Sequence, residues 1–527
     1  MKLDTFLHHL HFETDKTCPP DWEVNWEDAP LPYKLYRGLP EIALNTEIPL
    51  TLKRREDGLN PSLQELGHFL WYVYGLTHYS QSALFDGTKE MNVSFTQSLR
   101  RFVPSGGALY PNELYVYVKL DGAPEGIYHY DVAHHRLVLL REGNYDSYLS
   151  RSIDPSLSDS DCFCTIFVST VFWKNFYKYN NFSYRLQGLD AGVVIGQSLE
   201  AAGRMGFSSR VYYQFLDRAV NHLLGLSDQE ESVYAVIGLS MESPLTGADN
   251  DQKSEHMVSA SELCREVPAV THHSYNRSKR VIDYPMLRKL NDVSMFETKK
   301  SFVKLKKNNN KEFPLGTEIN LLPPAESLSF DFASVCRKRY SPESDFTLEK
   351  VNQTQLSALL KEIFSFSYHN DLDDTKGQIE TRVSLYGSFY NVEGIPNGAY
   401  SYDAKTHVLR RISKGDYREF LQYGLTLPNV NMYQVPLCFH LVGEKDHLKE
   451  ILGYRGYRIQ QMEAGILVQR LLLVSCALGM GGHPLLGFDA KQCDELYRID
   501  SKGKTSLIQI PVGPYRSRAW LKGSLLS

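Results

Sequence analysis

The chain repeats itself once, and this repeat limits the folds that it can adopt. Segment 126–137 returns 272 residues later as segment 398–409, with a glycine, two tyrosines, an aspartate, a histidine and a leucine identical in both. Further matches follow at a spacing of 273 residues, such as Tyr184 with Tyr457. Two copies are too few for a solenoid. Because two-fold homodimers are the commonest oligomers, the repeat predicts two domains fused as an intramolecular pseudo-dimer.

Each copy has the pattern of an α+β domain. Runs of β-branched and aromatic residues between polar residues predict strands at 114–120, 164–172, 231–239, 437–442 and 507–512. Recurring apolar residues with small residues between them predict long buried helices at 186–205 and 460–478. Shorter helices are expected to open the copies, at 61–74 and 351–363.

The segments outside the repeat divide the chain further. Residues 1–60 contain tryptophans, tyrosines and prolines, and we expect a docking arm or partial domain there. The two copies are expected at 61–240 and 326–527. Between them, 241–325 is polar and longer than an ordinary loop, so it predicts a linker or insert. Its basic run at 299–311 favours solvated linker over a phosphate- or peptide-binding patch.

Composition and charge restrict the environment and the partners. The formal net charge is −5, without the basic excess that nucleic-acid binding favours. No run approaches the ~20 apolar residues of a membrane span. The first fifteen positions include acidic residues and histidines, where a signal peptide would be apolar. We therefore expect a cytoplasmic protein that binds neither nucleic acid nor membrane.

Eight cysteines are scattered along the chain without a C-x-x-C pair, which fits reduced thiols in the cytosol. Cys162 and Cys164 lie two apart in an apolar run. A zinc site is one interpretation of this pair. Core positions are favoured, because no second ligand pair is visible.

The strongest motif is Arg-Phe-Val-Pro-Ser-Gly-Gly-Ala-Leu-Tyr-Pro-Asn-Glu at 101–113, directly before a predicted strand. Pro104 fixes the backbone, Ser105 offers a hydroxyl, and two glycines allow a ligand to approach the main chain. Such a loop can present amide groups to a flat heterocycle. A tight turn before a strand has the same composition, so the motif alone leaves both interpretations open.

With this loop, segments 126–131 and 178–185 resemble the azoline dehydrogenases of thiazole/oxazole-modified peptide biosynthesis. The best-known relatives serve the streptolysin S, cyanobactin and thiopeptide pathways, and the family belongs to the FMN-dependent nitroreductase superfamily. The resemblance covers about 60–240 well and 330–520 more loosely. It implies tandem nitroreductase-like domains, each with helices around a mixed, mainly antiparallel sheet.

The resemblance also implies one composite FMN site, because FMN in this superfamily lies between two domains. The first copy would hold the ring with its Pro-Ser loop. The second would hold the phosphate with basic clusters at its start and end, since guanidinium groups suit phosphate oxygens; ordinary surface charge is the alternative. The predicted FMN-binding residues are Arg101, Pro104, Ser105, Gly106, Gly107, Arg337, Lys338, Arg339, Arg516 and Arg518.

A second, mirror FMN site is expected to be degenerate. The place in the second copy that corresponds to the loop is read as 383–387, which lacks Pro-Ser. The first copy ends in Gly-Leu-Ser-Met at 238–241, without a basic residue. The sequence therefore predicts one FMN per chain.

Lys178 and Tyr179 match the Lys-Tyr pair that the family uses near the flavin, where the second copy has Ile451 and Leu452. Oxidation of a thiazoline to a thiazole requires hydride transfer and removal of a ring proton. Tyr179 is expected to accept that proton, with its pKa lowered by the Lys178 ammonium. Surface residues at a strand-to-helix connection are the alternative interpretation.

The repeated Tyr-Arg pairs at 184–185 and 457–458 are expected to be structural. Asp190 and Glu463 are their plausible acidic partners.

The sequence thus predicts an FMN-dependent dehydrogenase that oxidises thiazolines or oxazolines in a ribosomally made peptide. The precursor peptide and a cyclodehydratase complex are its expected partners, contacted through 1–60 or 241–325, and further oligomerisation is left open. A nitro- or quinone reductase with a nicotinamide donor would share the fold and the flavin. A flavin-free scaffold subunit is the third hypothesis.

Overall fold

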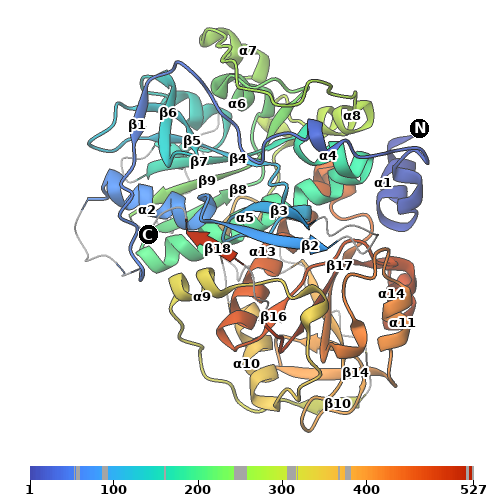
Figure 1. Ribbon diagram of the computed structural model, residues 1–527. Coiled ribbons are helices and arrows are strands. Elements are labelled where there is room, and N and C mark those ends of the chain that lie inside the picture. The colour runs from blue at the N-terminus through green and yellow to red at the C-terminus, as the bar shows by residue number, and fades with distance from the viewer. Residues whose placement is uncertain are drawn as a thin grey trace. The chain divides into compact units, whose positions relative to one another are not determined.

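The computed structural model in Figure 1 describes residues 1–52, 54, 60–85, 93–158, 162–241, 258–305, 316, 318–365, 368–373, 382–517 and 521–524. The chain divides into two compact units. Unit 1 takes in the described residues of 1–17, 305–368 and 373–517. Unit 2 takes in those of 18–304 with 369–372 and 521–524. Each unit contains one copy of the repeat.

Unit 2 is built on a sheet with the strand order β1-β6-β5-β4-β7-β9-β8-β11. Neighbours are antiparallel, except that β11 runs parallel to β8. A smaller antiparallel sheet has the order β18-β2-β3. The strands are β1 Glu41–Ala43, β2 His78–Phe85, β3 Val93–Arg100, β4 Asn112–Val118, β5 Gly126–Asp131, β6 Arg136–Glu142, β7 Cys162–Val171, β8 Ser208–Tyr212, β9 Glu231–Ser240, β11 His369–Asn370 and β18 Leu521–Ser524.

The helices of unit 2 include one long buried helix, α5, whose residues are nearly all buried along its full length. Helix α2 begins at a capping box between Ser62 and Glu65. Residues 258–304, expected as part of a linker, form α7 and α8, and Ala260 and Leu263 pack into the unit's hydrophobic core. The helices are α2 Leu63–Tyr74, α3 Asp146–Ser152, α4 Trp173–Tyr179, α5 Ser183–Met205, α6 Asp217–Leu224, α7 Ala260–Glu266 and α8 Pro285–Val293.

Unit 1 has a sheet with the strand order β10-β14-β13-β12-β15-β17-β16, in which all neighbours are antiparallel. Its strands are β10 Glu318–Leu321, β12 Ser384–Phe389, β13 Gly398–Asp403, β14 Val408–Lys414, β15 Leu437–Glu444, β16 Gly481–Gly482 and β17 Lys504–Gly513. Its helices are α1 Leu3–Phe12, α9 Phe332–Lys338, α10 Gln353–Phe364, α11 Arg418–Tyr423, α12 Lys449–Leu452, α13 Arg455–Ala477 and α14 Ala490–Tyr497.

The sequence repeat is a repeat of structure. The two main sheets follow the same strand order from β1 to β8 and from β10 to β16. The repeated Tyr and His side chains make the same bond in each copy, Tyr130 Oη to His135 Nδ1 and Tyr402 Oη to His407 Nδ1, both at 2.8 Å. Both copies also interrupt the register at the same place, before Tyr128 and its counterpart in β13. The predicted fold class, two α+β units with mainly antiparallel sheets, is confirmed.

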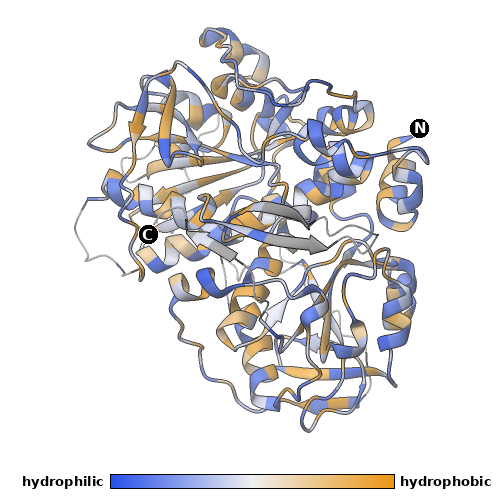
Figure 2. Ribbon diagram, in the orientation of Figure 1, coloured by the Kyte–Doolittle hydropathy of each residue, from blue (hydrophilic) through white to orange (hydrophobic). Residues whose placement is uncertain are grey.

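Each sheet packs its long helix against a hydrophobic core, and Figure 2 shows hydrophobic residues along the strands. Every residue of β4 and β5 is buried, and so is every residue of β13. Cys162 and Cys164 of β7 are buried as well, as the core interpretation predicted. None of the helices in the described part of the chain has both the length and the apolar character of a membrane span.

Candidate functional site

The Pro-Ser-Gly-Gly loop lies between β3 and β4 and contains the short 3-10 helix Gly106–Ala108. Gly107 has a φ of 64°, in the left-handed region that glycine adopts without strain. A Cβ added there would lie 2.6 Å from Tyr179 Oη and 2.9 Å from Lys178 Nζ. The structure therefore brings the loop of the predicted flavin site and the predicted catalytic pair together within unit 2.

The polar groups of this loop bond inward to helix α5. The Ser105 hydroxyl donates to Asp190 Oδ2 at 2.7 Å, and the Gly106 N–H donates to Asp190 Oδ1 at 3.2 Å. Ser105 Oγ also accepts the Tyr110 N–H at 2.9 Å. Asp190, expected as a partner of Arg185, instead anchors the loop. Burial raises the pKa of its carboxyl to about 7.

Lys178 and Tyr179 form the end of α4, a helix that the sequence pattern did not predict. Lys178 Nζ lies 5.3 Å from the centre of the Trp26 ring and 4.9 Å from that of Tyr179. Burial lowers the pKa of Lys178, and burial with nearby Asp190 raises the pKa of Tyr179. The expected lowering of the Tyr179 pKa is therefore wrong: removal of the phenol from water raises that pKa, and the nearby Asp190 carboxyl raises it further.

Arg101 is almost fully buried at the start of the motif. Its guanidinium donates to the Tyr74 carbonyl at 3.0 Å and to the Pro32 carbonyl at 2.7 Å. The same group lies 3.9 Å from the centre of the Tyr74 ring and 4.8 Å from that of Tyr110. These contacts hold the ends of the loop. The predicted role of Arg101 toward FMN stays a prediction.

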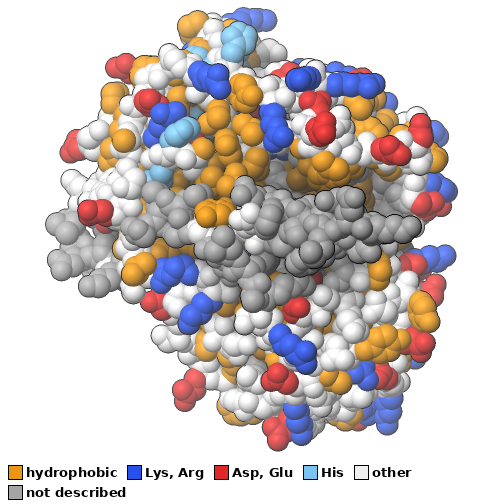
Figure 3. All heavy atoms as spheres, viewed as in Figure 1, with side chains coloured by type: hydrophobic (Ala, Val, Ile, Leu, Met, Phe, Trp, Pro, Cys, Tyr) orange, Lys and Arg blue, Asp and Glu red, His pale blue; other side chains and the backbone are white. Residues whose placement is uncertain are grey.

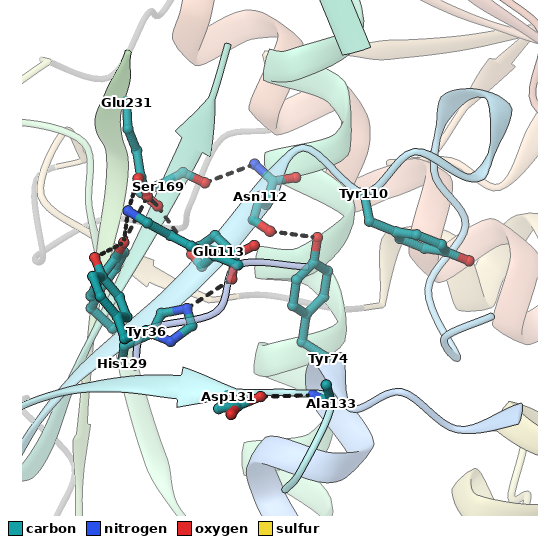
Figure 4. Close-up of polar contacts among 12 residues, drawn as sticks. Tyr36, Tyr74, Tyr110, Asn112, Glu113, His129, Asp131, Ala133, Ser169 and Glu231 are labelled. Carbon is teal, nitrogen blue, oxygen red and sulfur yellow. Dashed lines mark hydrogen bonds and ion pairs between the residues drawn. The ribbon is translucent and has the colours of Figure 1, made fainter. Parts of the chain in front are cut away.

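A buried ion pair that the sequence did not reveal fixes the loop against α4. The Lys174 ammonium pairs with Glu113 and donates to the Tyr110 carbonyl at 3.2 Å. Glu113 Oε2 lies 2.9 Å from His129 Nε2 (Figure 4). Burial would raise the pKa of Glu113, but Lys174 and His129 outweigh it and hold that pKa well below its usual range. Glu113 is the last residue of the motif, and Lys174 lies one helical turn before Lys178. Their pairing could not be predicted, because the two residues lie far apart in the sequence.

A second set of buried polar contacts ties residues 34–36 to the same sheet. Lys34 Nζ lies 2.6 Å from Glu231 Oε2, and the Tyr115 hydroxyl donates to Glu231 Oε1 at 3.0 Å. The Ser169 hydroxyl donates to the same carboxylate oxygen at 2.6 Å. Figure 4 shows Tyr36 beside Ser169 and Glu231, which lie on β7 and β9 near Glu113. This part of the expected docking arm is built into unit 2.

The basic clusters of unit 1 lie near each other. Arg337 and Lys338 are exposed at the end of α9, and Arg516 is exposed after β17. The rings of Tyr340 and Tyr515, the neighbours of these clusters, lie 5.6 Å apart. The Arg516 N–H donates to the Asp345 carbonyl at 2.9 Å. Arg518 lies outside the described residues. On the face seen in Figure 3, acidic and basic side chains are interspersed.

Two curated proteins each match about a quarter of the chain. No family model matches the chain. The trifolitoxin-processing protein TfxB of Rhizobium leguminosarum bv. trifolii is 31% identical over 142 residues, which are 26% of this chain and 38% of TfxB. The nitroreductase-assigned protein MJ1384 of Methanocaldococcus jannaschii is 24% identical over 131 residues, 25% of this chain and 64% of that protein. The chain thus spans less than two thirds of either relative.

A solved structure covers nearly all of the chain. The crystal structure of a protein from Anabaena variabilis assigned as a nitroreductase superposes on 98% of this chain and 100% of its own, with a TM-score of 0.71 and 22% identity. This chain has a tandem nitroreductase fold.

In unit 1, most of the segment that corresponds to the loop lies outside the described residues. Residues 384–389 form β12, the counterpart of β4, so the expected equivalence of 383–387 with the loop is wrong: the sheet order shifts it to the preceding segment. There Arg382 Nε donates to Glu463 Oε1 at 2.8 Å, and Arg382 also pairs with Asp373 at 2.5 Å. Glu463 occupies in α13 the position of Asp190 in α5.

Proposed function

We propose that this chain is an FMN-dependent oxidoreductase that oxidises thiazolines or oxazolines of a ribosomally made precursor peptide to the aromatic azoles. The nitroreductase fold and the likeness to a trifolitoxin-processing protein support a redox role in the maturation of such a peptide. The loop and the Lys-Tyr pair, which resemble those of azoline dehydrogenases, support the finer assignment. Work with a cyclodehydratase complex is part of the same proposal.

The residues present fit a flavin. A side chain at Gly107 would collide with Lys178 and Tyr179, so glycine lets the pair lie directly against the main chain of the loop. Exposed guanidinium and ammonium groups at Arg337, Lys338 and Arg516 have the chemistry that a phosphate needs. When bound, FMN would accept the hydride from the azoline ring. That one FMN uses both groups of residues stays a prediction from the sequence.

The observation that carries the proposal is the contact between Gly107 and the pair of α4. Because burial lowers the pKa of Lys178, its neutral amine is accessible at a lower pH than for an exposed lysine. Because the pKa of Tyr179 is raised, its phenol keeps its proton and acts as a hydrogen-bond donor. We assign Lys178 Nζ as the acceptor of the ring proton and Tyr179 as the group that orients the ring.

The first test combines flavin content with turnover. We expect purified protein to bind FMN and to convert azoline-containing peptide to azole, detected as a loss of two mass units per ring. Lys178→Met should lower kcat by about 10²- to 10⁴-fold, the usual contribution of a general base, with FMN still bound. Tyr179→Phe should lower kcat by a smaller factor. Full activity of Lys178→Met would exclude the assigned proton acceptor.

A nicotinamide-dependent reductase is the second candidate, because the nitroreductase-assigned relatives share the fold. Rapid bleaching of the bound flavin by NADPH, without turnover of azoline peptide, would favour it. Protein that stays colourless after incubation with FMN would favour a scaffold role and contradict both enzymatic proposals.

A further inference from the structure

The two copies carry an acid at the same position of their long helix, but its surroundings differ. In α13, Glu463 is bound by the Arg382 guanidinium through Nε at 2.8 Å. In α5, Asp190 is bonded only by the neutral Ser105 hydroxyl and Gly106 N–H, and within the described residues no Lys or Arg pairs with it. Both carboxyl groups are buried, with 7% exposure each. Unit 1 neutralises this acid, whereas unit 2 does not.

A buried carboxylate without a cation is unstable relative to its neutral form. The pKa of Asp190 is accordingly raised by burial to about 7, although the two hydrogen bonds oppose the shift. Asp190 therefore changes charge near neutral pH, directly behind the loop.

The geometry makes Ser105 respond to that change. A hydroxyl has one hydrogen and two lone pairs. Ser105 Oγ uses one lone pair for the Tyr110 N–H, and its hydrogen points to Asp190 Oδ2 at 2.7 Å while the acid is ionised. When the acid is protonated, its own O–H can donate to the second lone pair of Oγ. The hydrogen of Ser105 is then released from α5.

We propose that Asp190 is a positioning residue whose ionisation decides whether the Ser105 hydroxyl donates to α5 or to a ring bound against the loop. The proposal rests on the proposed function, because it takes that ring to be the flavin. Asp190 moves only a proton, between Oδ2 and solvent, and no bond to the ligand is made or broken.

The tyrosines beside Asp190 do not change charge in the pH range in which Asp190 ionises. Tyr179 and Lys178 approach from α4, and Tyr74 from α2. Burial raises the pKa of both tyrosines, so they stay neutral through the range in which Asp190 ionises. Lys178 is the other group that can change charge here, and the comparison of variants separates its effect from that of Asp190.

The first experiment needs no flavin. An infrared difference spectrum across a pH series should show a protonated carboxyl band that disappears with a midpoint near 7, the pKa of Asp190. Burial also raises the pKa values of Asp371 and Asp494, to about 6, so these groups add to the band. Asp190→Asn should remove the component with the midpoint near 7, and Glu463→Gln, the matched control at the equivalent position of α13, should keep it. A band unchanged by Asp190→Asn would overturn the proposal, whether or not the protein binds FMN.

The second experiment follows FMN affinity by quenching of flavin fluorescence over the same pH series. We expect binding about fivefold tighter below the midpoint than above it, the value of about one neutral hydrogen bond. Asp190→Asn and Ser105→Ala should each give a flat profile, and Glu463→Gln should follow the wild type. Ser105→Ala keeps the acid and removes the hydroxyl, so it also serves if Asp190→Asn folds poorly.

The two proposals fail in different ways. Absence of FMN binding in every variant would contradict the proposed function. The infrared band would then still show whether the Asp190 carboxyl titrates near pH 7. A wild-type pH profile in both Asp190→Asn and Ser105→Ala would overturn the inference about Asp190 and leave the proposed function intact.

Discussion

Asp190 makes the stability of unit 2 depend on pH. Its folded pKa of about 7 lies above the ordinary value of 3.8. A raised folded pKa contributes stability that is present below the unfolded pKa and is lost as pH rises through the folded one. Asp190→Asn removes this titration, so the variant should gain stability relative to wild type as pH rises from about 4 to 7, by up to about 4 kcal/mol. Urea unfolding at both ends of that range measures it.

The matched change at Glu463 should act in the opposite direction. Glu463→Gln removes the charge that Arg382 binds and leaves a buried guanidinium with Asp373 alone. Loss of one partner of a buried ion pair costs about 3 kcal/mol. A lower urea midpoint near neutral pH is therefore expected for Glu463→Gln. Equal changes in the urea midpoint for Asp190→Asn and Glu463→Gln would contradict the inference that only unit 1 neutralises its buried acid.

Gly107 has little freedom to change, because of its φ and its close neighbours. Gly107→Ala would bring a Cβ within 2.6 Å of Tyr179 Oη and impose a φ of 64° on alanine. The backbone alone costs about 1–2 kcal/mol, and the pair of α4 must move as well. We expect weaker FMN binding with a modest fall in melting temperature, measured by fluorescence titration and calorimetry. Ala108→Gly, which relieves a φ of 56°, is the control that should bind FMN normally.

At the scale of elements, α4 and the loop are joined by the Lys174–Glu113 pair. Lys174→Met leaves the buried Glu113 carboxylate with His129 as its remaining close partner. We expect a loss of about 3 kcal/mol in chemical unfolding, because an uncompensated charge stays buried. The double variant with Glu113→Gln should recover part of that loss. A double variant less stable than Lys174→Met would show that the pair does not act as a unit.

The sequence predicted the long elements because their periodicity is strong. The buried helix expected at 186–205 is α5, and the strand expected at 231–239 is β9. Helix α4 was missed, since seven residues rich in aromatics show no helical period. The sequence also paired the loop with Lys178 and Tyr179 only through a family resemblance. Their actual proximity depends on how α4 packs, and the pKa of Tyr179 depends on burial that no local pattern reports.

The buried polar network was beyond prediction for a related reason. Glu113 and Lys174 lie 61 residues apart, and Lys34 and Glu231 lie 197 apart. The packing of α4 and of residues 34–36 against the sheet brings these residues together. Taken singly, a charged residue is most often found at the surface, so no one of these residues indicates a buried pair.

For the whole molecule, the loop occurs in the described part of unit 2 and the exposed basic clusters occur in unit 1. If one FMN needs both, the chain binds one FMN. Flavin released from purified protein and counted per chain should give one equivalent, and Arg516→Ala combined with Arg518→Ala should weaken binding at least tenfold, by loss of charge-assisted hydrogen bonds to phosphate. Two equivalents per chain would contradict the degenerate second site.

The spacing between equivalent residues of the two copies changes by one residue along the chain. The bulge before Tyr128 in β5 and its counterpart before Tyr400 in β13 align these strands at a spacing of 272 residues. The bulge after Val168 in β7 and its counterpart after Leu441 in β15 align the next strands at 273. By Tyr184 and Tyr457 the spacing is 273. A residue gained inside a strand would turn every later side chain to the wrong face, so the strands could not change length independently. The one-residue change therefore lies between β6 and β7 in one copy and between β14 and β15 in the other, in the connection that holds α3 and α11. The change in length lies in a connection between strands, and both sheets keep the same strand order.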